Sequence, residues 1–260
     1  MRIINLSSGS DGNLTYLEDG DKKILLDVGL SCSETLKRLE LIKINPKDLT
    51  AILITHEHSD HIKGLDMFAS KFNLPVYTHD KVWQGLEDKL KKVSAANRKR
   101  FDGPFAFENL FITPIHLPHD VECFGYSFCN NDKKISVVTD LGHLNDNILH
   151  SLKGSQLVYI ESNYDRQMLL SGTKYPLALK RRIDGPNGHL SNLDCASGIE
   201  FLAKTGTRQV ILSHLSKENN SPSLAYNTIK DKIANAGIIE GVDIKIDVAS
   251  TNPGTFFRLK

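Results

Sequence analysis

The sequence predicts an α/β protein, and three observations predict it. Short apolar segments of strand length alternate along the chain with longer segments of helical length. Histidine and aspartate residues directly follow several of the apolar segments. The stretch ILITHEHSDHIKG, residues 52–64, places three histidines, a glutamate and an aspartate in six consecutive positions behind an aliphatic run. Together these features predict a sheet that carries a polar site at the ends of its strands.

The predicted strands are short apolar runs enriched in β-branched residues, and polar residues separate them. They cover residues 22–29, 51–56, 75–79, 110–119, 134–140, 155–162, 208–214 and 256–259. Helices are predicted between them, over residues 33–42, 61–72, 80–92, 145–153, 192–206 and 221–237. The helix at 192–206 has the clearest boundaries, with Ser191 as N-cap, Asp194 three residues later and Gly206 beyond its last apolar position. Because no repeat or linker interrupts this alternation, we expect one domain over residues 1–260.

Composition excludes several classes of protein. The 260 residues are 40% hydrophobic, which suffices for a sizeable core. The 32 Lys and Arg nearly balance the 31 Asp and Glu, so net charge gives no argument for nucleic-acid binding. The four cysteines form no CxxC pair, which disfavours a disulfide framework or a thiolate zinc site. With no apolar leader or membrane-length segment, the sequence predicts a cytoplasmic protein that does not contact membranes.

Polar residues at the strand ends are expected to converge. His56, Asp140 and His214 each lie at, or one residue past, the end of a predicted strand, and His119 follows residues 110–118 in the same way. Side chains that leave one edge of a sheet can form a single site although they are far apart in sequence.

The spacing within residues 56–61 suits metal binding. His56 and His58, at alternate positions, can reach one ion, while Asp60 and His61 turn toward a second. Imidazole and carboxylate ligands suit Zn²⁺, Mn²⁺ or Fe²⁺, and the absence of sulfur argues against copper storage or iron–sulfur roles. Two alternatives are a polar loop that caps the following helix and a single structural zinc.

The motif HxHxDH at residues 56–61 resembles that of the metallo-β-lactamase-fold hydrolases. The segments SSGSDGN, LLDVGLS, FGYSF, VVTDLG, ESNYD, GHLSN and LSHLSKENNSP extend the resemblance over nearly the whole chain, toward the bacterial YycJ/WalJ subgroup. The resemblance implies a four-layer αββα sandwich that binds two divalent ions, Zn²⁺ or Mn²⁺, with Fe²⁺ as a further candidate. It implies that one ion is held by His56, His58 and His119, the other by Asp60, His61 and His214, and that Asp140 bridges both.

Two of these assignments have competitors. His116 competes with His119, but the family spacing places the ligand six residues before the Gly-Tyr of FGYSF, which selects His119. His189 competes with His214, but His214 closes an apolar strand as the other ligands do, whereas His189 lies in a glycine-containing loop before a helix. We therefore expect His119 and His214 to be ligands.

His189 is expected to have a catalytic role of its own. Nucleases that resemble tRNase Z pair a glutamate after a central strand with a histidine in a similar turn, and this chain has Glu161 and His189 in those places. A carboxylate that orients an imidazole and raises its pKa produces a general acid near neutral pH. The expected catalytic residues are therefore Glu161 and His189, together with the ligand Asp60.

The resemblance points to a phosphodiester substrate. Asp140 stands where β-lactamases of this fold carry cysteine, and the segment between Asp140 and His214 is too short for the large inserted domain of related processing nucleases. The subgroup implies 5′-to-3′ exonuclease action on double-stranded DNA, with a metal-bridging hydroxide as nucleophile. A small-molecule phosphodiester or thioester hydrolase and a non-catalytic metal-binding regulatory module are the alternatives.

Local basic clusters are the candidates for contact with DNA. Lys174, Lys180, Arg181 and Arg182 precede His189 and could neutralise phosphates. A second basic cluster lies within residues 89–100, where a solvated helix face is an equal alternative.

Overall fold

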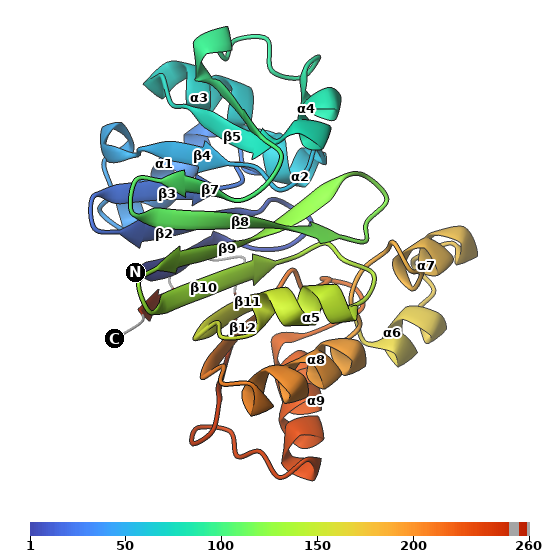
Figure 1. The fold of residues 1–260 in the computed structure, drawn as a ribbon. Coiled ribbons are helices and arrows are strands. Elements are labelled where there is room, and N and C mark those ends of the chain that lie inside the picture. The colour runs from blue at the N-terminus through green and yellow to red at the C-terminus, as the bar shows by residue number, and fades with distance from the viewer. Residues whose placement is uncertain (250–254, 259–260) are drawn as a thin grey trace. The chain divides into compact units, whose positions relative to one another are not determined.

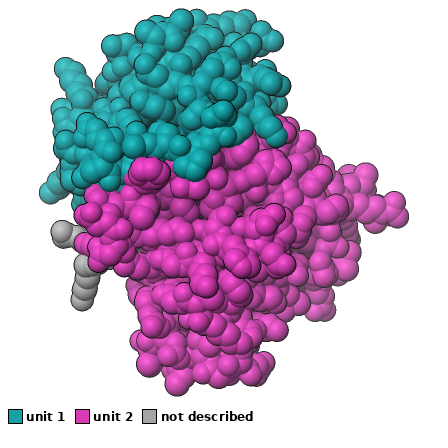
Figure 2. Space-filling model, viewed as in Figure 1, with its two compact units in different colours: residues 1–110, 250–260 teal, residues 111–249 magenta. Residues whose placement is uncertain are grey.

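The computed structural model describes residues 1–249 and 255–258, and the chain forms two compact units. The first unit comprises residues 1–110 and 250–260, and the second comprises residues 111–249 (Figure 2). Each unit contains a sheet of both parallel and antiparallel strands together with helices (Figure 1). The predicted α/β class is therefore confirmed, while the prediction of a single domain stays a prediction.

The first unit contains a sheet with strand order β14-β1-β2-β3-β4-β5-β6. Strands β1 to β3 and β14 pair antiparallel, whereas β3 to β6 pair parallel. The strands of this sheet are β1 Arg2–Ser7, β2 Leu14–Asp19, β3 Lys22–Leu26, β4 Ala51–Leu53, β5 Val76–His79, β6 Arg98–Phe101 and β14 Thr255–Arg258. Residues 1–110 also contain β7 Phe105–Phe107, which is not a strand of this sheet. The α-helices are α1 Cys32–Leu41, α2 Ser59–Ile62, α3 Leu65–Phe72 and α4 Asp80–Leu86, and short 3-10 helices cover Pro46–Asp48 and Ala95–Asn97.

The strands of the second unit run in the order β13-β12-β11-β10-β9-β8. Strands β10 to β13 are parallel, and β8 and β9 join them antiparallel. The strands are β8 Leu110–Leu117, β9 Cys123–Asn130, β10 Lys133–Val138, β11 Leu157–Glu161, β12 Gln209–Ser213 and β13 Lys245–Val248. The helices are α5 Asp146–Leu152, α6 Arg166–Ser171, α7 Leu177–Ile183, α8 Asn192–Lys204 and α9 Pro222–Asn235.

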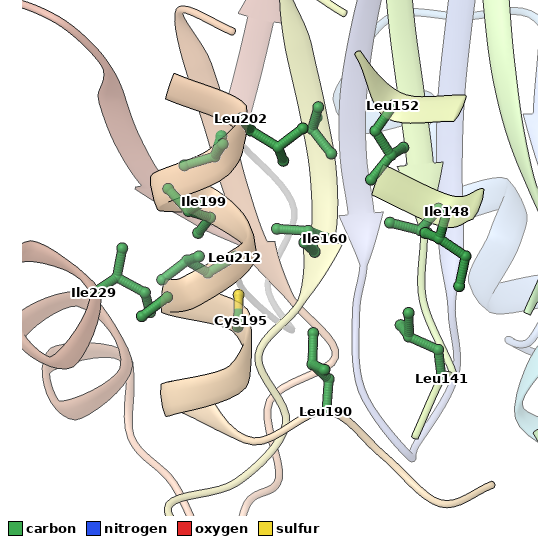
Figure 3. Close-up of a cluster of buried hydrophobic side chains, with 14 of the residues drawn as sticks. Leu141, Ile148, Leu152, Ile160, Leu190, Cys195, Ile199, Leu202, Leu212 and Ile229 are labelled. Carbon is green, nitrogen blue, oxygen red and sulfur yellow. The ribbon is translucent and has the colours of Figure 1, made fainter. Parts of the chain in front are cut away.

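The core of the second unit anchors the loops that carry the polar residues. Helices α5, α8 and α9 contribute apolar side chains that pack with those of β11 and β12 (Figure 3). Leu141 and Leu190 belong to this cluster and are fully buried. Burial of each leucine side chain contributes about 1.5–3 kcal/mol. Because Leu141 follows Asp140 and Leu190 follows His189, the core fixes the backbone next to both polar residues.

The predicted helix over residues 61–72 is broken in the structure. Helix α2 ends at Ile62 and α3 begins at Leu65, with Gly64 between them. The Gly64 amide donates to the carbonyl of Val28, and a Cβ at Gly64 would lie 2.1 Å from the carbonyl oxygen of Leu30. The helix therefore breaks where the backbone at Gly64 packs closely against the backbone of residues 28–30. The spacing of apolar residues in the sequence does not reveal this contact.

Other boundaries also differ from the prediction. Helix α4 ends at Leu86 rather than near residue 92, because the chain turns there and buries Leu90 and Val93. Strands β1, β2, β6, β7, β9 and β13 and helices α6 and α7 were not predicted. The predicted start of α8 is confirmed, since the Ser191 hydroxyl accepts from the amide of Asp194 at 3.1 Å. Within the described residues, no helix combines the length and apolar character needed to cross a membrane.

Candidate metal and catalytic site

The histidine loop, residues 56–61, follows β4 in the first unit. His56 is buried, and its ring centroid lies 4.7 Å from that of His58 and 4.0 Å from that of His61. A carboxylate oxygen of Asp60 lies 3.5 Å from Nε2 of His61. The four residues predicted as ligands within HxHxDH are thus neighbours, although β4 ends at Leu53 and His56 lies three residues past it.

Asp27 and Thr55 orient two rings of the histidine loop. Nδ1 of His61 lies 2.8 Å from Oδ2 of Asp27, which also accepts from the Thr55 hydroxyl at 2.9 Å. Since that hydroxyl donates to Asp27, it can accept from Nδ1 of His56, 3.0 Å away. Both imidazoles therefore carry their proton on Nδ1 and a lone pair on Nε2, the nitrogen that would bind a metal ion. At His61 this nitrogen lies 2.9 Å from Nδ2 of Asn13, so a metal ion would replace that amide as its partner. Asp27 adopts a left-handed backbone with φ of 60°, a conformation that costs about 1–2 kcal/mol outside glycine.

Asn13 and Gly29 hold the backbone of the histidine loop in place. The amide of Asn13 donates to the Asp60 carbonyl at 2.7 Å, and the amide of Gly29 donates to the Asn13 carbonyl at 2.8 Å. A Cβ at Gly29 would lie only 1.7 Å from the Asp60 carbonyl oxygen. Only glycine therefore permits this approach, and the approach determines where the Asp60 backbone lies.

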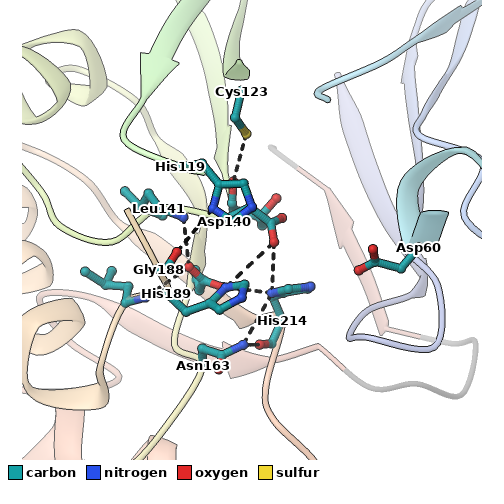
Figure 4. Close-up of polar contacts among 12 residues, drawn as sticks. Asp60, His119, Cys123, Asp140, Leu141, Asn163, Gly188, His189 and His214 are labelled. Atoms are coloured by element: carbon teal, nitrogen blue, oxygen red, sulfur yellow. Dashed lines mark hydrogen bonds and ion pairs between the residues drawn. The ribbon is translucent and has the colours of Figure 1, made fainter. Parts of the chain in front are cut away.

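In the second unit, His119, Asp140, His189 and His214 lie close together (Figure 4). His189 comes from the loop before α8, and the other predicted site residues lie at or just past the ends of strands. Asp140 lies two residues past β10, Glu161 ends β11, His214 directly follows β12, and His119 lies two residues past β8. Asp140 and His214 have left-handed backbones, with φ of 64° and 54°. Such strain is found where the surrounding structure holds a functional side chain in place.

Glu161 is fully buried and accepts four hydrogen bonds. Its Oε1 accepts from Nδ1 of His189 at 2.8 Å and from Nδ1 of His214 at 2.7 Å. Its Oε2 accepts from the backbone amides of Leu141 at 3.0 Å and Leu190 at 3.1 Å. A single carboxylate oxygen therefore orients both imidazoles, and each ring presents Nε2 away from the glutamate.

The charges of this group shift two pKa values. Burial raises the pKa of Glu161, but the charges and hydrogen bonds of His189 and His214 outweigh burial and hold it below its usual range. Burial lowers the pKa of His189, but the Glu161 carboxylate outweighs burial and raises it above 6.5. The side chain of His189 is 24% exposed, so solvent reaches the ring that would carry this proton.

His119 and His116 have different surroundings. Nδ1 of His119 lies 3.2 Å from the carbonyl oxygen of Gly188, and its ring centroid lies 5.5 Å from that of His189. The side chain of His116 is 59% exposed, lies 3.4 Å from Glu122 and packs its ring against Phe124. The surroundings of the two rings are those expected when His119 is the ligand and His116 packs locally.

The donor set of the second unit fits a divalent metal ion. Ligand atoms of Asp140, Glu161, His189 and His214 all lie within 4.8 Å of one another. The oxygens of Glu161 already accept four N–H groups, so we interpret Glu161 as an orienting residue rather than a ligand. Ligand histidines in proteins donate their other ring N–H to a carboxylate or a carbonyl. Nδ1 of His61, His119 and His214 each lies within hydrogen-bond distance of such an oxygen.

The four side chains predicted to contact DNA differ in whether they already have a partner within the protein. Lys180 donates to the carbonyls of Leu170 and Gly172 at the end of α6, and Lys174 pairs with Glu218 at 2.5 Å. Arg182 donates to Asp120. Arg181 is exposed, and within the described residues it makes no ion pair.

Sequence reasoning assigned no role to several residues that hold this site. Asp27, Thr55 and Asn13 orient the histidine loop. Buried asparagines form hydrogen bonds with the segment that follows Glu161. Asp27 and Asn13 lie within the quoted segments LLDVGLS and SSGSDGN, but neither segment reveals which ring each residue contacts.

Comparisons with known proteins agree with this architecture. Residues 22–215 match the family described as the Beta-lactamase superfamily domain. Exodeoxyribonuclease WalJ of Streptococcus pneumoniae is 39% identical over 96% of this chain and 94% of its own length. Exodeoxyribonuclease YycJ of Bacillus anthracis is 35% identical over 95% and 94%.

Solved structures show the same fold. The metallo-beta-lactamase fold protein YhfI of Bacillus subtilis aligns with a TM-score of 0.74 at 17% identity, over 98% of each chain. The short form of human tRNase Z aligns with a TM-score of 0.61 at 18% identity, over 84% of this chain and 93% of its own. The chain therefore belongs to the β-lactamase superfamily, in the group that includes the YycJ and WalJ proteins.

Proposed function

We propose that this protein is a metal-dependent exodeoxyribonuclease that degrades double-stranded DNA from the 5′ end. The observation that carries the proposal is the shared carboxylate oxygen of Glu161, which lies 2.8 Å from Nδ1 of His189 and 2.7 Å from Nδ1 of His214. The relatives named exodeoxyribonucleases, at 35% and 39% identity, support DNA as the substrate.

The ligand set that we propose is the one predicted from the sequence. We propose two divalent ions, with His56, His58, Asp60 and His61 as donors from the first unit and His119, Asp140 and His214 as donors from the second. Zn²⁺ and Mn²⁺ suit this mixture of imidazole and carboxylate. When bound, such ions would polarise the phosphate and make a water molecule nucleophilic near neutral pH.

The residues of the chain must also stabilise the leaving group. A sugar alkoxide is a poor leaving group, so its departure requires a proton donor. Glu161 raises the pKa of His189 and engages its Nδ1, so the second ring proton, on Nε2, is the one available to a substrate. His189 therefore acts as general acid and Glu161 as the residue that keeps it protonated and oriented.

Substituting His189 tests this assignment. His189→Ala should keep its metal and cleave a diester with a nitrophenolate leaving group at nearly the wild-type rate, because that leaving group needs no proton. Cleavage of duplex DNA should fall about 10²–10⁴-fold, the usual contribution of a general acid. Metal content, diester hydrolysis and release of nucleotides from 5′-labelled and 3′-labelled duplexes are measured together. An equal loss on both substrates, or a loss of metal, would contradict the role of His189, and wild-type protein that cleaves only the small diester would contradict the proposed substrate.

A further inference from the structure

Two buried side-chain amides near Glu161 form a reciprocal hydrogen-bonded pair. Nδ2 of Asn192 donates to Oδ1 of Asn220 at 3.0 Å, and Nδ2 of Asn220 donates to Oδ1 of Asn192 at 2.9 Å. The two side chains belong to residues that are 1% and 7% exposed. Buried amides of this kind cost stability unless their hydrogen bonds are satisfied, so their geometry is closely determined.

This amide pair reaches the segment that directly follows Glu161. Nδ2 of Asn220 also lies 2.9 Å from the carbonyl oxygen of Ser162 and 3.0 Å from that of Asn163. The Ser162 hydroxyl donates to Oδ1 of Asn192 at 2.7 Å. The segment after β11 is thereby fixed to the first residue of α8 and to the residue before the Ser221 N-cap of α9.

The same contacts extend to His214 and His189. Nδ2 of Asn163 donates to the carbonyl of His214 at 2.6 Å, and the amide of Asn163 donates to the carbonyl of Leu190 at 2.9 Å. Asn163 therefore holds the left-handed backbone of His214 on one side and the residue after His189 on the other. Three loops that are distant in sequence meet through this network.

We propose that the Asn192–Asn220 pair is a positioning device that aligns these loops so that His189 and His214 reach the same oxygen of Glu161. This inference deepens the proposed function, because it adds positioning residues behind the same proposed acid and ligand. Neither asparagine touches a reacting atom. Their action is geometric, and displacement of a catalytic group by about 1 Å can lower a rate about 10²-fold.

The test compares Asn220→Ala with the isosteric Asn220→Asp. Asn220→Asp keeps the acceptor for Asn192 but loses the donors to the carbonyls of Ser162 and Asn163. Ser136→Ala is the matched control, because Ser136 is a buried residue of the same unit whose hydroxyl bonds only to Ser127 and Ser155 in the described hydrogen-bond network. All variants are first compared by circular dichroism and thermal unfolding.

The decisive measurement is the NMR signal of histidine Nδ1 protons in the metal-free protein. Hydrogen bonds to Glu161 should give two slowly exchanging, strongly downfield signals, assigned by their loss in His189→Ala and in Glu161→Gln. Both signals should broaden or disappear in the Asn220 variants and persist in Ser136→Ala. With saturating metal, kcat on DNA should fall about tenfold or more at nearly constant KM in the Asn220 variants only.

The outcomes separate this inference from the proposed function. Folded Asn220 variants that keep both signals and the wild-type kcat, with only a lower Tm, would overturn the inference, because the pair would then be merely structural. If Asn220→Ala does not fold, the isosteric aspartate variant gives the decision. The signals are recorded without metal or DNA, so they decide about the amide pair even if the wild-type protein cleaves no DNA.

Discussion

Replacing Glu161 with glutamine tests how the site is held. The carboxylate accepts from two imidazoles through one oxygen and from two backbone amides through the other. Glutamine has the same shape but offers a single oxygen and an NH₂ group. Since the amides of Leu141 and Leu190 can only donate, the glutamine oxygen must face them, and its NH₂ group must face His189 and His214.

This orientation reverses the proton positions on both rings. Each Nδ1 must become an acceptor, which moves the ring proton to Nε2 and removes the lone pair through which His214 would bind metal. Two charge-assisted hydrogen bonds of about 1.5–3 kcal/mol each are lost. Loss of an orienting partner lowers metal affinity about 10–100-fold, equivalent to about 1.4–2.8 kcal/mol. His189 also loses the carboxylate that raises its pKa, so DNA cleavage should fall about 10²–10⁴-fold.

The assay titrates metal into wild-type protein and Glu161→Gln while following DNA and nitrophenyl diester hydrolysis. At saturating metal the diester rate should recover in the variant, whereas the DNA rate should stay low. Glu122→Gln is the matched control, since Glu122 pairs with the exposed His116 and should leave both rates unchanged. Wild-type metal affinity together with a wild-type DNA rate in Glu161→Gln would refute the reasoning.

Three further predictions follow from the geometry. Gly29→Ala should lower the free energy of unfolding by about 1–3 kcal/mol and should also lower metal content, because the new Cβ would clash with the Asp60 carbonyl. Gly103→Ala is the control and should change neither, because no atom lies within 4 Å of its new Cβ. Arg181→Ala should weaken DNA binding and reduce its salt dependence without slowing diester hydrolysis; equal slowing of both would contradict a phosphate contact. In metal-free protein, the stability lost in His189→Ala should be largest between pH 4.5 and 6.5, by about 1–3 kcal/mol. The interaction stabilises the fold while His189 is protonated and Glu161 is ionised. It is lost as pH rises through the raised pKa of His189 and as pH falls through the lowered pKa of Glu161. Unfolding measurements across this pH range that show no such maximum would contradict the pairing.

The sequence by itself determined the α/β class, and it supplied the residues that we propose as metal ligands and general acid. Apolar segments followed by His56, Asp140 and His214 identify strand ends, because residues that leave the end of a strand lie at one edge of its sheet. The HxHxDH motif can be recognised from the sequence because its residues are close neighbours in the chain. The start of α8 at Ser191 could be predicted for the same reason, because capping is a local interaction.

The resemblance predicted the pairing of Glu161 with His189, but only the tertiary structure decided which partners hold His56, His61 and His214. That Glu161 serves both His189 and His214 depends on the pairing of β11 with β12 and on the loop before α8. The break at Gly64 depends on the approach of the backbone near Leu30, and the pairing of Asn192 with Asn220 depends on the packing of α8 with α9. These contacts join residues far apart in the chain, and their hydrogen bonds form only after the core has brought the segments together, so no local pattern in the sequence records them.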